Sequence, residues 1–435
     1  MDGAFAKKIA DRTAIIAVVG LGYVGLPLAR IFASAGYRVF GVEIDRERVD
    51  AINGGKSYVD DISDDEIAAL VARGLLSATS DVSVQRDADA ILICVPTPLT
   101  RGKQPDLSYV TAAVTQIVPH LRPGQLIVLE STTFPGTTRE VVKPILERSG
   151  LVAGQDFWLA FSPERLDPGN KSRAINTVPK IVGGLTPWCT ELASLMYRQI
   201  TATVVPVSSS TVAEMVKVYE NVFRNVNIAL VNELTLLCDR MGLDVWEIID
   251  AAATKPYGFM PFYPGPGVGG HCIPVDPYYL SAKAREYDFH ARFIELAATV
   301  NDSMPYYALS RTTTALGAQG KVLGGTKVLV LGVAYKKDIS DVRESPSLKI
   351  IELLEKRGAN VAYHDPYIPE ITLPNPGVKL TSVSLTDERL SEVDCVIIAT
   401  DHSNLDYRRV AEKARLVIDT RNVLRGTGGP HVVRL

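Results

Sequence analysis

Cys272 lies in the segment whose residue types are best suited to covalent chemistry. It follows His271 at the end of residues 264–270, a run of proline and glycine that is typical of neither helix nor strand. We therefore expect Cys272 on an irregular, close-fitting loop. Exposed backbone N–H groups and a nearby cation favour a thiolate there, so Cys272 is a candidate nucleophile, although a cysteine beside glycines can also have no chemical role. Asp276-Pro277 resembles an N-cap followed by proline at the first helical position, which gives Asp276 a structural role, a chemical role or both.

A polar stripe on a predicted helix offers groups for acid–base chemistry. Thr211 and Glu214 have the spacing of a capping box and predict a helix that runs to about Met241. Four polar residues recur along it at steps of three and four: Glu214, Lys217, Asn221 and Arg224. The stripe faces either a ligand or, as an ordinary charged helix face, water. A helix of about 30 residues is far longer than average, so we expect it to connect two domains and to offer a surface for a second copy.

A glycine-rich turn at residues 20–25 joins an apolar strand pattern to a helix that is expected to reach about Ala35. Its first glycine permits the tight turn, the second lets backbone N–H groups approach a pyrophosphate, and the third allows close packing of helix on strand. A second strand follows at residues 37–42. The complete strand, turn, helix and strand predict a dinucleotide site.

Glu43 ends this unit, 18 residues after the third glycine of the turn. A carboxylate at this position can bind a ribose diol and would repel a 2′-phosphate, so we predict NAD as the cofactor. The neighbouring cations Arg46 and Arg48 weaken the argument against NADP. A solvated carboxylate at a strand end is the alternative role for Glu43.

Two later strand patterns, residues 90–95 and 125–129, end close to Thr97 and Thr132. Ligands of a doubly wound sheet lie beyond the carboxyl ends of its strands, so both hydroxyls are expected to face the cofactor. Alternatively, they satisfy backbone groups of the turns. The residues expected to contact the cofactor are Gly20, Gly22, Tyr23, Val24, Gly25, Glu43, Arg48, Thr97 and Thr132.

The last third of the chain repeats the alternation of strand and helix. Strands and a helix are predicted, in chain order, at residues 327–332 (strand), 345–357 (helix), 360–363 (strand) and 394–400 (strand). This region lacks GxGxxG and carries Lys336 and Arg343 in the corresponding segment. Cations in place of a close backbone approach indicate a phosphate-bearing ligand other than the dinucleotide.

The sequence therefore predicts an α/β fold with two Rossmann-like, doubly wound parallel-sheet domains joined by a long central helix. The expected parts are an NAD-binding domain at 1–206, a central helical region with the reactive loop at 207–315, and a second nucleotide-binding domain at 316–435. A chain of 435 residues is long enough for two or three domains.

Composition excludes several other classes of protein. Hydrophobic residues make up 46% of the chain and the net charge is -3, so neither disorder nor nucleic-acid binding is favoured. No apolar run approaches the roughly 18 residues of a membrane helix, and the start resembles no signal peptide, so we expect a cytoplasmic protein without a membrane partner. The five cysteines form no CxxC pair and no metal site is expected. Four of them are expected in the core: Cys94, Cys189, Cys238 and Cys395.

Six motifs together carry a family resemblance that extends over essentially the whole chain. They are GLGYVGLP, ESTTFPGTT, FSPER, AEMVKVYENVFRNVNIALVNE, PGPGVGGHCIPVDP and YKKDISDVRES. In this order they resemble the UDP-glucose/GDP-mannose dehydrogenase family. The resemblance implies two Rossmann-like domains around a long helix, a homodimer or higher homo-oligomer, and a UDP-sugar substrate. It also implies oxidation of the sugar's primary alcohol to a carboxylate, with two NAD and one water consumed.

The resemblance also implies roles for individual residues. Cys272 matches the nucleophile that forms a thiohemiacetal and then a thioester. Lys217, Asp276 and Asn221 match residues around the reacting oxygen, Glu164 matches a base, and Thr132 matches a threonine beside the water. The residues implied in binding the substrate are Glu164, Arg165, Lys217, Asn221, Arg224, Gly269, Gly270, Lys336 and Arg343.

One departure from the family pattern concerns the substrate. UDP-glucose members usually carry an aromatic residue and a second glutamate where this chain has Arg165 and Pro168. The segment instead resembles the branch that acts on UDP-N-acetylhexosamines. UDP-N-acetylglucosamine is the implied substrate, with UDP-glucose and UDP-N-acetylmannosamine as alternatives. A catalytically silent nucleotide-sugar sensor is the alternative outside enzymes, because fold alone does not imply activity.

Overall fold

The structure is a computed structural model of the chain and describes residues 2–59, 61–100, 102–165, 178–270, 272–373, 377–427 and 429–435. The side chains of Asp2 and Cys272 are outside this description. The predicted nucleophilic side chain, His271 and Pro168 therefore lie outside the described residues.

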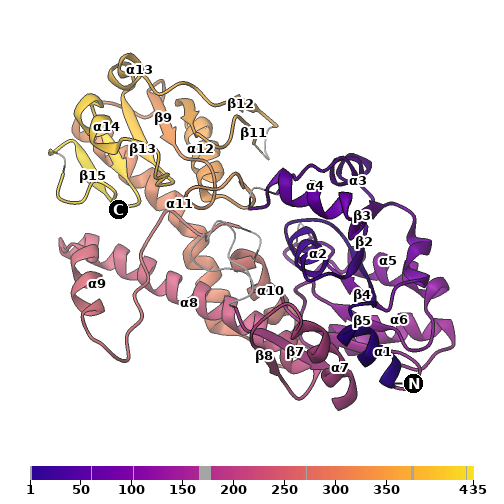
Figure 1. The fold of residues 1–435 in the computed structure, drawn as a ribbon. Helices are drawn as coiled ribbons and strands as arrows, with labels where there is room; N and C mark the ends of the chain where they lie inside the picture. Colours follow the sequence, from indigo (N-terminus) through magenta and orange to yellow (C-terminus); the bar gives the residue numbers. More distant parts are fainter. Residues whose placement is uncertain are drawn as a thin grey trace. The chain divides into compact units, whose positions relative to one another are not determined.

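The chain forms two compact units (Figure 1). The N-terminal unit consists of Met1–Glu220 with Tyr278–Phe289, and the C-terminal unit of Asn221–Pro277 with His290–Leu435. Each unit is built around one sheet, which is mostly parallel in the N-terminal unit and parallel in the C-terminal unit.

Among the described residues of the N-terminal unit, eight strands form one sheet in the order β3-β2-β1-β4-β5-β6-β7-β8. All neighbours are parallel except β6 and β7. The strands are β1 (Ile15–Val19), β2 (Arg38–Val42), β3 (Leu76–Thr79), β4 (Ala90–Ile93), β5 (Leu126–Leu129), β6 (Trp158–Phe161), β7 (Lys180–Gly184) and β8 (Val204–Pro206). The strand order changes direction between β1 and β4, which is where ligands bind in such sheets.

Helices cover both faces of this sheet, so its central strands are apolar throughout. On β1, Ile16 and Val18 join the core on one face, whereas Ala17 and Val19 join the core on the other. The α-helices of the unit before the long helix are α1 (Asp2–Ala10), α2 (Gly25–Ser34), α3 (Arg46–Asn53), α4 (Asp64–Ala72), α5 (Ser108–Ile117), α6 (Lys143–Leu146) and α7 (Pro187–Tyr197). A π-helical turn, η3 (Thr138–Val142), precedes α6.

In the C-terminal unit, five described strands form a parallel sheet in the order β10-β9-β13-β14-β15. These are β9 (Lys327–Leu331), β10 (Asn360–His364), β13 (Cys395–Ile398), β14 (Val417–Asp419) and β15 (Val432–Arg434), with β11 (Glu370–Thr372) and β12 (Lys379–Thr381) as a separate antiparallel pair. Residues of α11 (Arg292–Ala318) and α12 (Pro346–Lys356) pack on one face, and those of α13 (Asp387–Glu392) and α14 (Tyr407–Lys413) on the other. The predicted fold class is thus confirmed.

Helix α8 (Ser210–Met241) is 32 residues long and is followed by α9 (Val245–Ala253). The predicted capping box at its start is wrong. Ser209 Oγ accepts the N–H of Val212 at 3.3 Å, while Glu214 binds groups that are distant in the sequence. No helix among the described residues is both long and apolar enough to cross a bilayer.

Helix α10 (Cys272–Arg285) corrects two predictions. Cys272 is its first residue rather than part of an irregular loop. Asp276 and Pro277 lie within the helix, so they are not its N-cap and first residue. The reason is Gly270, whose φ of +83° ends the irregular segment two residues before Cys272.

Candidate active site

The glycine turn after β1 has the geometry that the sequence predicts. Gly20 has φ +87°, and a Cβ on Gly25 would lie 1.8 Å from the Gly20 carbonyl oxygen. A Cβ on Gly22 would meet no atom within 4 Å. Two glycines are therefore required by the fold, and the middle one leaves open space beside the backbone. Helix α2 begins immediately after Val24, which makes no side-chain cap, so its amino end is suited to a phosphate.

Glu43 is buried at the carboxyl end of β2 and binds the glycine turn directly. Its Oε2 accepts the N–H of Leu21 at 2.9 Å, and its Oε1 accepts the N–H of Ile44 at 2.8 Å. Arg48 Nη1 lies 3.8 Å from Oε2. With only 7% of its surface exposed, Glu43 is not the solvated strand-end carboxylate of the alternative interpretation.

The sheet order places the ends of β4 and β5 next to the glycine turn. Thr97, after β4, is buried, and Thr132, after β5, is partly buried. Ser131 performs the structural role considered for both threonines, because its hydroxyl donates to the Val95 carbonyl at 2.8 Å. Tyr23 in the turn is 43% exposed.

The predicted polar stripe of α8 consists of residues with different environments. Lys217 and Asn221 are buried, whereas Arg224 is exposed. Asn221 Nδ2 donates a hydrogen bond to Asp276 Oδ2 in the C-terminal unit. Glu214 faces the protein interior, where it accepts the N–H groups of Gly136 at 2.6 Å and Thr138 at 2.8 Å, and the Thr138 hydroxyl at 2.6 Å. A simple water-facing stripe is therefore wrong for all but Arg224.

The glycine segment before Cys272, residues 264–270, packs against the turn after β9. Gly270 donates its N–H to the Arg343 carbonyl at 2.9 Å. A Cβ on Gly269 would lie 2.6 Å from Tyr335 Cβ, and one on Gly270 would lie 2.9 Å from the Tyr335 ring. The glycines thus permit a contact that any side chain would prevent. Two motifs some 70 residues apart in the sequence are in contact within the C-terminal unit.

Buried amides fix the beginning of the same segment. Gly265 donates its N–H to Asn232 Oδ1 at 3.1 Å, and Asn232 Nδ2 donates to Asn301 Oδ1 at 2.9 Å. Asn301 Nδ2 in turn donates to Asn225 Oδ1 at 2.8 Å. Helices α8 and α11 therefore hold both the segment and each other through buried polar groups that satisfy one another.

Lys336 and Arg343 lie in the turn between β9 and α12, at the place that the glycine motif occupies in the N-terminal unit. Lys336 is partly buried and Arg343 is exposed. Arg343 forms a two-pronged pair with Asp341, with Nη2 to Oδ2 at 2.6 Å and Nε to Oδ1 at 3.0 Å. Arg343 is thus paired with an acidic residue of the same turn, and the phosphate contact that the sequence predicts for this turn stays a prediction.

Three family models match consecutive parts of the chain. They describe the NAD binding domain at residues 14–201, the central domain at 211–303 and the UDP binding domain at 329–426 of the UDP-glucose/GDP-mannose dehydrogenase family. The chain belongs to this family. It is an NAD-dependent nucleotide-sugar dehydrogenase, with the glycine turn in the NAD-binding part and the cationic turn in the UDP-binding part.

Individual relatives cover nearly the whole dehydrogenase. The NDP-N-acetyl-D-galactosaminuronic acid dehydrogenase of Ralstonia nicotianae is 38% identical over 94% of this chain and 96% of its own. The UDP-N-acetyl-D-mannosamine dehydrogenase of Methanococcus maripaludis is 35% identical, over 94% and 93%. A solved structure of the UDP-D-ManNAc dehydrogenase from Pyrococcus horikoshii has a TM-score of 0.88 and 34% identity, over 97% of this chain and 98% of that one.

The dehydrogenase also has a buried charged cluster that sequence reasoning missed. Lys180 Nζ lies 2.6 Å from Glu130 Oε2 and 3.6 Å from Glu164 Oε2, and Tyr197 donates its hydroxyl to Glu130 Oε1. Burial raises the pKa of Glu130, since it outweighs the opposing effect of Lys180. In the sequence Glu130 follows one apolar strand and Lys180 begins another, and no local signal pairs the two.

Arg165, which follows Glu164, is held on both sides. Its Nη2 and Nε bind the two carboxylate oxygens of Glu220 on α8 at 2.6 and 3.2 Å, and its Nη1 donates to the Pro179 carbonyl at 2.7 Å. The cluster and this pair together fix the segment that carries Glu164. The described residues contain no group of His, Cys, Asp and Glu suited to a metal ion.

Proposed function

We propose that the chain oxidises the C6 alcohol of a UDP-N-acetylhexosamine to the carboxylate through a cysteine-bound intermediate. Two similar proteins, named for N-acetylmannosamine and N-acetylgalactosaminuronic acid, support an acetamido sugar. The departure from the UDP-glucose pattern at Arg165 supports the same class. UDP-N-acetylglucosamine, the sugar that the sequence favours, stays a prediction beside its mannosamine isomer.

The observation that carries the proposal is the arrangement on α10. Cys272 opens this helix, and Asp276, hydrogen-bonded to Asn221, follows one turn later. The amino end of a helix favours a nearby negative charge, and hence a thiolate at this position.

The proposed reaction uses the following groups. The glycine turn and Glu43 would hold NAD, which would supply the hydride acceptor for each of two oxidations. The Cys272 thiolate adds to the aldehyde carbon to give a thiohemiacetal. Loss of the second hydride leaves a thioester, which water hydrolyses to the carboxylate and the free thiol. One alcohol, two NAD and one water thus give one carboxylate, two NADH and three protons.

We assign the remaining proposed roles from the family motifs. Lys217 and Asn221 stabilise negative charge on the sugar oxygen, because a buried ammonium and an amide N–H both favour the anion. Asp276 orients the Asn221 amide through the hydrogen bond that joins them. Glu164 acts as base, and Thr132 binds the water.

A spectrophotometric assay tests the proposal. The protein is offered NAD with UDP-N-acetylglucosamine, UDP-N-acetylmannosamine, UDP-N-acetylgalactosamine or UDP-glucose, and NADH is counted per sugar consumed. We expect an acetamido sugar to be preferred, with two NADH per sugar. A preference for UDP-glucose would refute the substrate class, and one NADH per sugar would refute the carboxylate product.

We further propose that the protein works as a homodimer that pairs through α8. Apolar side chains remain exposed at helical spacing from near its middle to its end: Phe223, Leu230, Leu237 and Met241. Light scattering should give twice the mass of one chain, and Leu230→Glu should shift it toward one. A wild-type mass of 47.2 kDa at micromolar concentration would contradict this proposal.

A further inference from the structure

The turn between β9 and α12, residues 333–345, is here called the cation loop. It carries Lys336 and Arg343, and its Arg343 carbonyl holds Gly270. The loop is irregular but closed, since Tyr335 donates its N–H to the Asp341 carbonyl at 3.0 Å. Asp338 at its tip has φ +61°, a backbone conformation that residues other than glycine rarely adopt. Contacts from outside the loop must therefore hold this shape.

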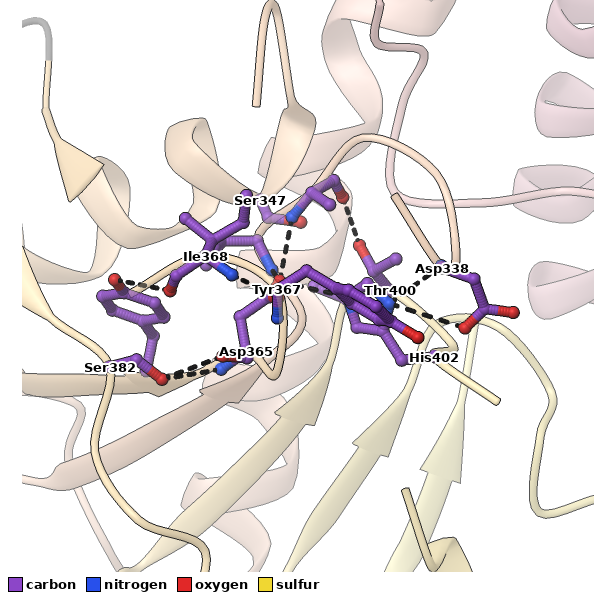
Figure 2. A network of polar contacts seen from close by, with 12 residues as sticks. Asp338, Ser347, Asp365, Tyr367, Ile368, Ser382, Thr400 and His402 are labelled. Carbon is purple, nitrogen blue, oxygen red and sulfur yellow. Dashed lines mark hydrogen bonds and ion pairs between the residues drawn. The ribbon is translucent and has the colours of Figure 1, made fainter. Parts of the chain in front are cut away.

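Asp365, directly after β10, holds the base of the cation loop. Its buried Oδ2 accepts the N–H groups of Val333 at 2.7 Å and Ala334 at 3.1 Å. Thr400, after β13, donates its hydroxyl to the Ala334 carbonyl at 2.6 Å. The ends of β10 and β13 therefore hold the start of the loop at Ala334, whose N–H donates to Asp365 and whose carbonyl accepts from Thr400. Figure 2 shows Asp365 at the centre of this network.

His402 holds the tip of the loop and is itself completely buried. Its Nδ1 accepts the N–H of Asp338 at 3.0 Å, and its Nε2 lies 3.0 Å from Asp365 Oδ2 (Figure 2). An amide N–H can only donate, so Nδ1 carries no proton, and Nε2 must then be the nitrogen that donates to Asp365. Neighbouring Ser403 donates its N–H and hydroxyl to the Asp338 carboxylate at 2.8 and 2.6 Å.

The base and the tip of the loop are thus linked through one histidine ring. Burial opposes charge on Asp365, but the hydrogen bond from His402 and those from the backbone outweigh it and hold the pKa of Asp365 below its ordinary value. The carboxylate therefore stays ionised and keeps both the ring and the loop in place.

We propose that His402 is a positioning residue for nucleotide-sugar binding. It fixes the tip of the cation loop, and with it the backbone that carries Lys336 and the Arg343–Asp341 pair, in the shape that receives the diphosphate, while Asp365 fixes the base. The inference rests on the proposed function, because it takes the loop as the diphosphate site. A loop held in its binding conformation avoids the entropic cost of ordering when the ligand arrives. His402 has no part in the chemistry itself.

Two substitutions of His402 test the roles of its two ring nitrogens separately. In His402→Asn the amide oxygen replaces Nδ1 and can still accept the N–H of Asp338. In His402→Gln the amide nitrogen replaces Nε2 and still donates to Asp365, but the loop tip loses its acceptor. His431→Gln is the matched control, because His431 bonds the Ala411 carbonyl at 2.7 Å, away from the cation loop.

The full-length proteins are titrated with UDP by calorimetry, and KM is measured for the nucleotide sugar and for NAD. We expect His402→Gln to weaken UDP binding about tenfold and to raise the nucleotide-sugar KM similarly, with the NAD KM unchanged. His402→Asn and His431→Gln should bind UDP within about twofold of wild type.

Equal UDP binding by His402→Gln and wild type would overturn the inference but leave the proposed function intact. Equal losses in all three variants would overturn it as well, because they would show a general effect on folding. A wild-type protein that binds no UDP would instead refute the proposed function, and the inference with it.

Discussion

Replacing Glu214 by glutamine should remove much of the pH dependence of folding stability between pH 5 and 8. Glu214 is fully buried on α8, and three donors from Gly136 and Thr138 face its carboxylate. Burial nevertheless raises the pKa of this carboxyl from 4.5 to about 7, since the three hydrogen bonds offset it only in part.

Proton linkage gives the direction in which folding stability changes with pH. The folded protein binds this proton more tightly than the unfolded chain, so the stabilisation is complete below pH 4.5 and is lost as the pH rises through about 7. For one group with these two pKa values, the free energy of unfolding should fall by about 2.5 kcal/mol between pH 5 and pH 8.

Urea unfolding of wild type and Glu214→Gln at pH 5, 6, 7 and 8, followed by circular dichroism, measures this effect. The variant can be less stable at every pH. Donors face both carboxylate oxygens of Glu214, whereas glutamine has only one side-chain oxygen that can accept. The test is the difference between the two proteins, which should change by about 2.5 kcal/mol across the range. Glu233→Gln, at an exposed position of the same helix, is the control and should keep the wild-type slope.

If the stability of Glu214→Gln and wild type varies with pH in parallel, the reasoning is refuted. The carboxylate would then be ionised throughout, and the three donors would outweigh burial.

Substitutions at the glycine turn, at the buried Lys180–Glu130 pair and at Cys272 test other parts of the structure. Gly25→Ala should abolish NAD binding in fluorescence titrations, since its Cβ would meet a carbonyl oxygen at 1.8 Å, whereas Gly22→Ala should fold normally and bind NAD more weakly. Lys180→Met should lower the free energy of unfolding by about 3 kcal/mol, because Glu130 loses its buried partner, and Glu130→Gln in the same chain should recover part of this. Cys272→Ser should form no sugar acid in the NADH assay; near-normal acid formation would exclude it as nucleophile.

The sheets and the cofactor turn could be predicted because their signals are local. A parallel strand covered on both faces must be apolar where it is buried, as β1 is throughout and β9 is after its exposed first residue, Lys327. The glycine spacing follows from a turn that admits no Cβ at Gly20 or Gly25. These constraints involve neighbouring residues, so the sequence displays them directly.

Side chains whose partners are distant in the sequence could not be assigned in the same way. Glu214 has the spacing of a capping residue, but its partners lie 76 and 78 residues earlier. Asp276 precedes a proline as an N-cap would, yet it bonds Asn221 from within α10. Lys180 and Glu130 are 50 residues apart, and nothing near either one indicates the other.

The turns after β1 and β9 differ in their glycines. The first has Gly20, Gly22 and Gly25, whereas the turn after β9 has Gly332 alone, followed by the side chains of the cation loop. The described part of the chain thus offers one dinucleotide turn for a reaction that we propose consumes two NAD. The two cofactor molecules must then use that turn in succession. The first NADH has to depart and be replaced while the half-oxidised sugar stays on the enzyme, so turnover should depend on the rate of this exchange as well as on the chemistry.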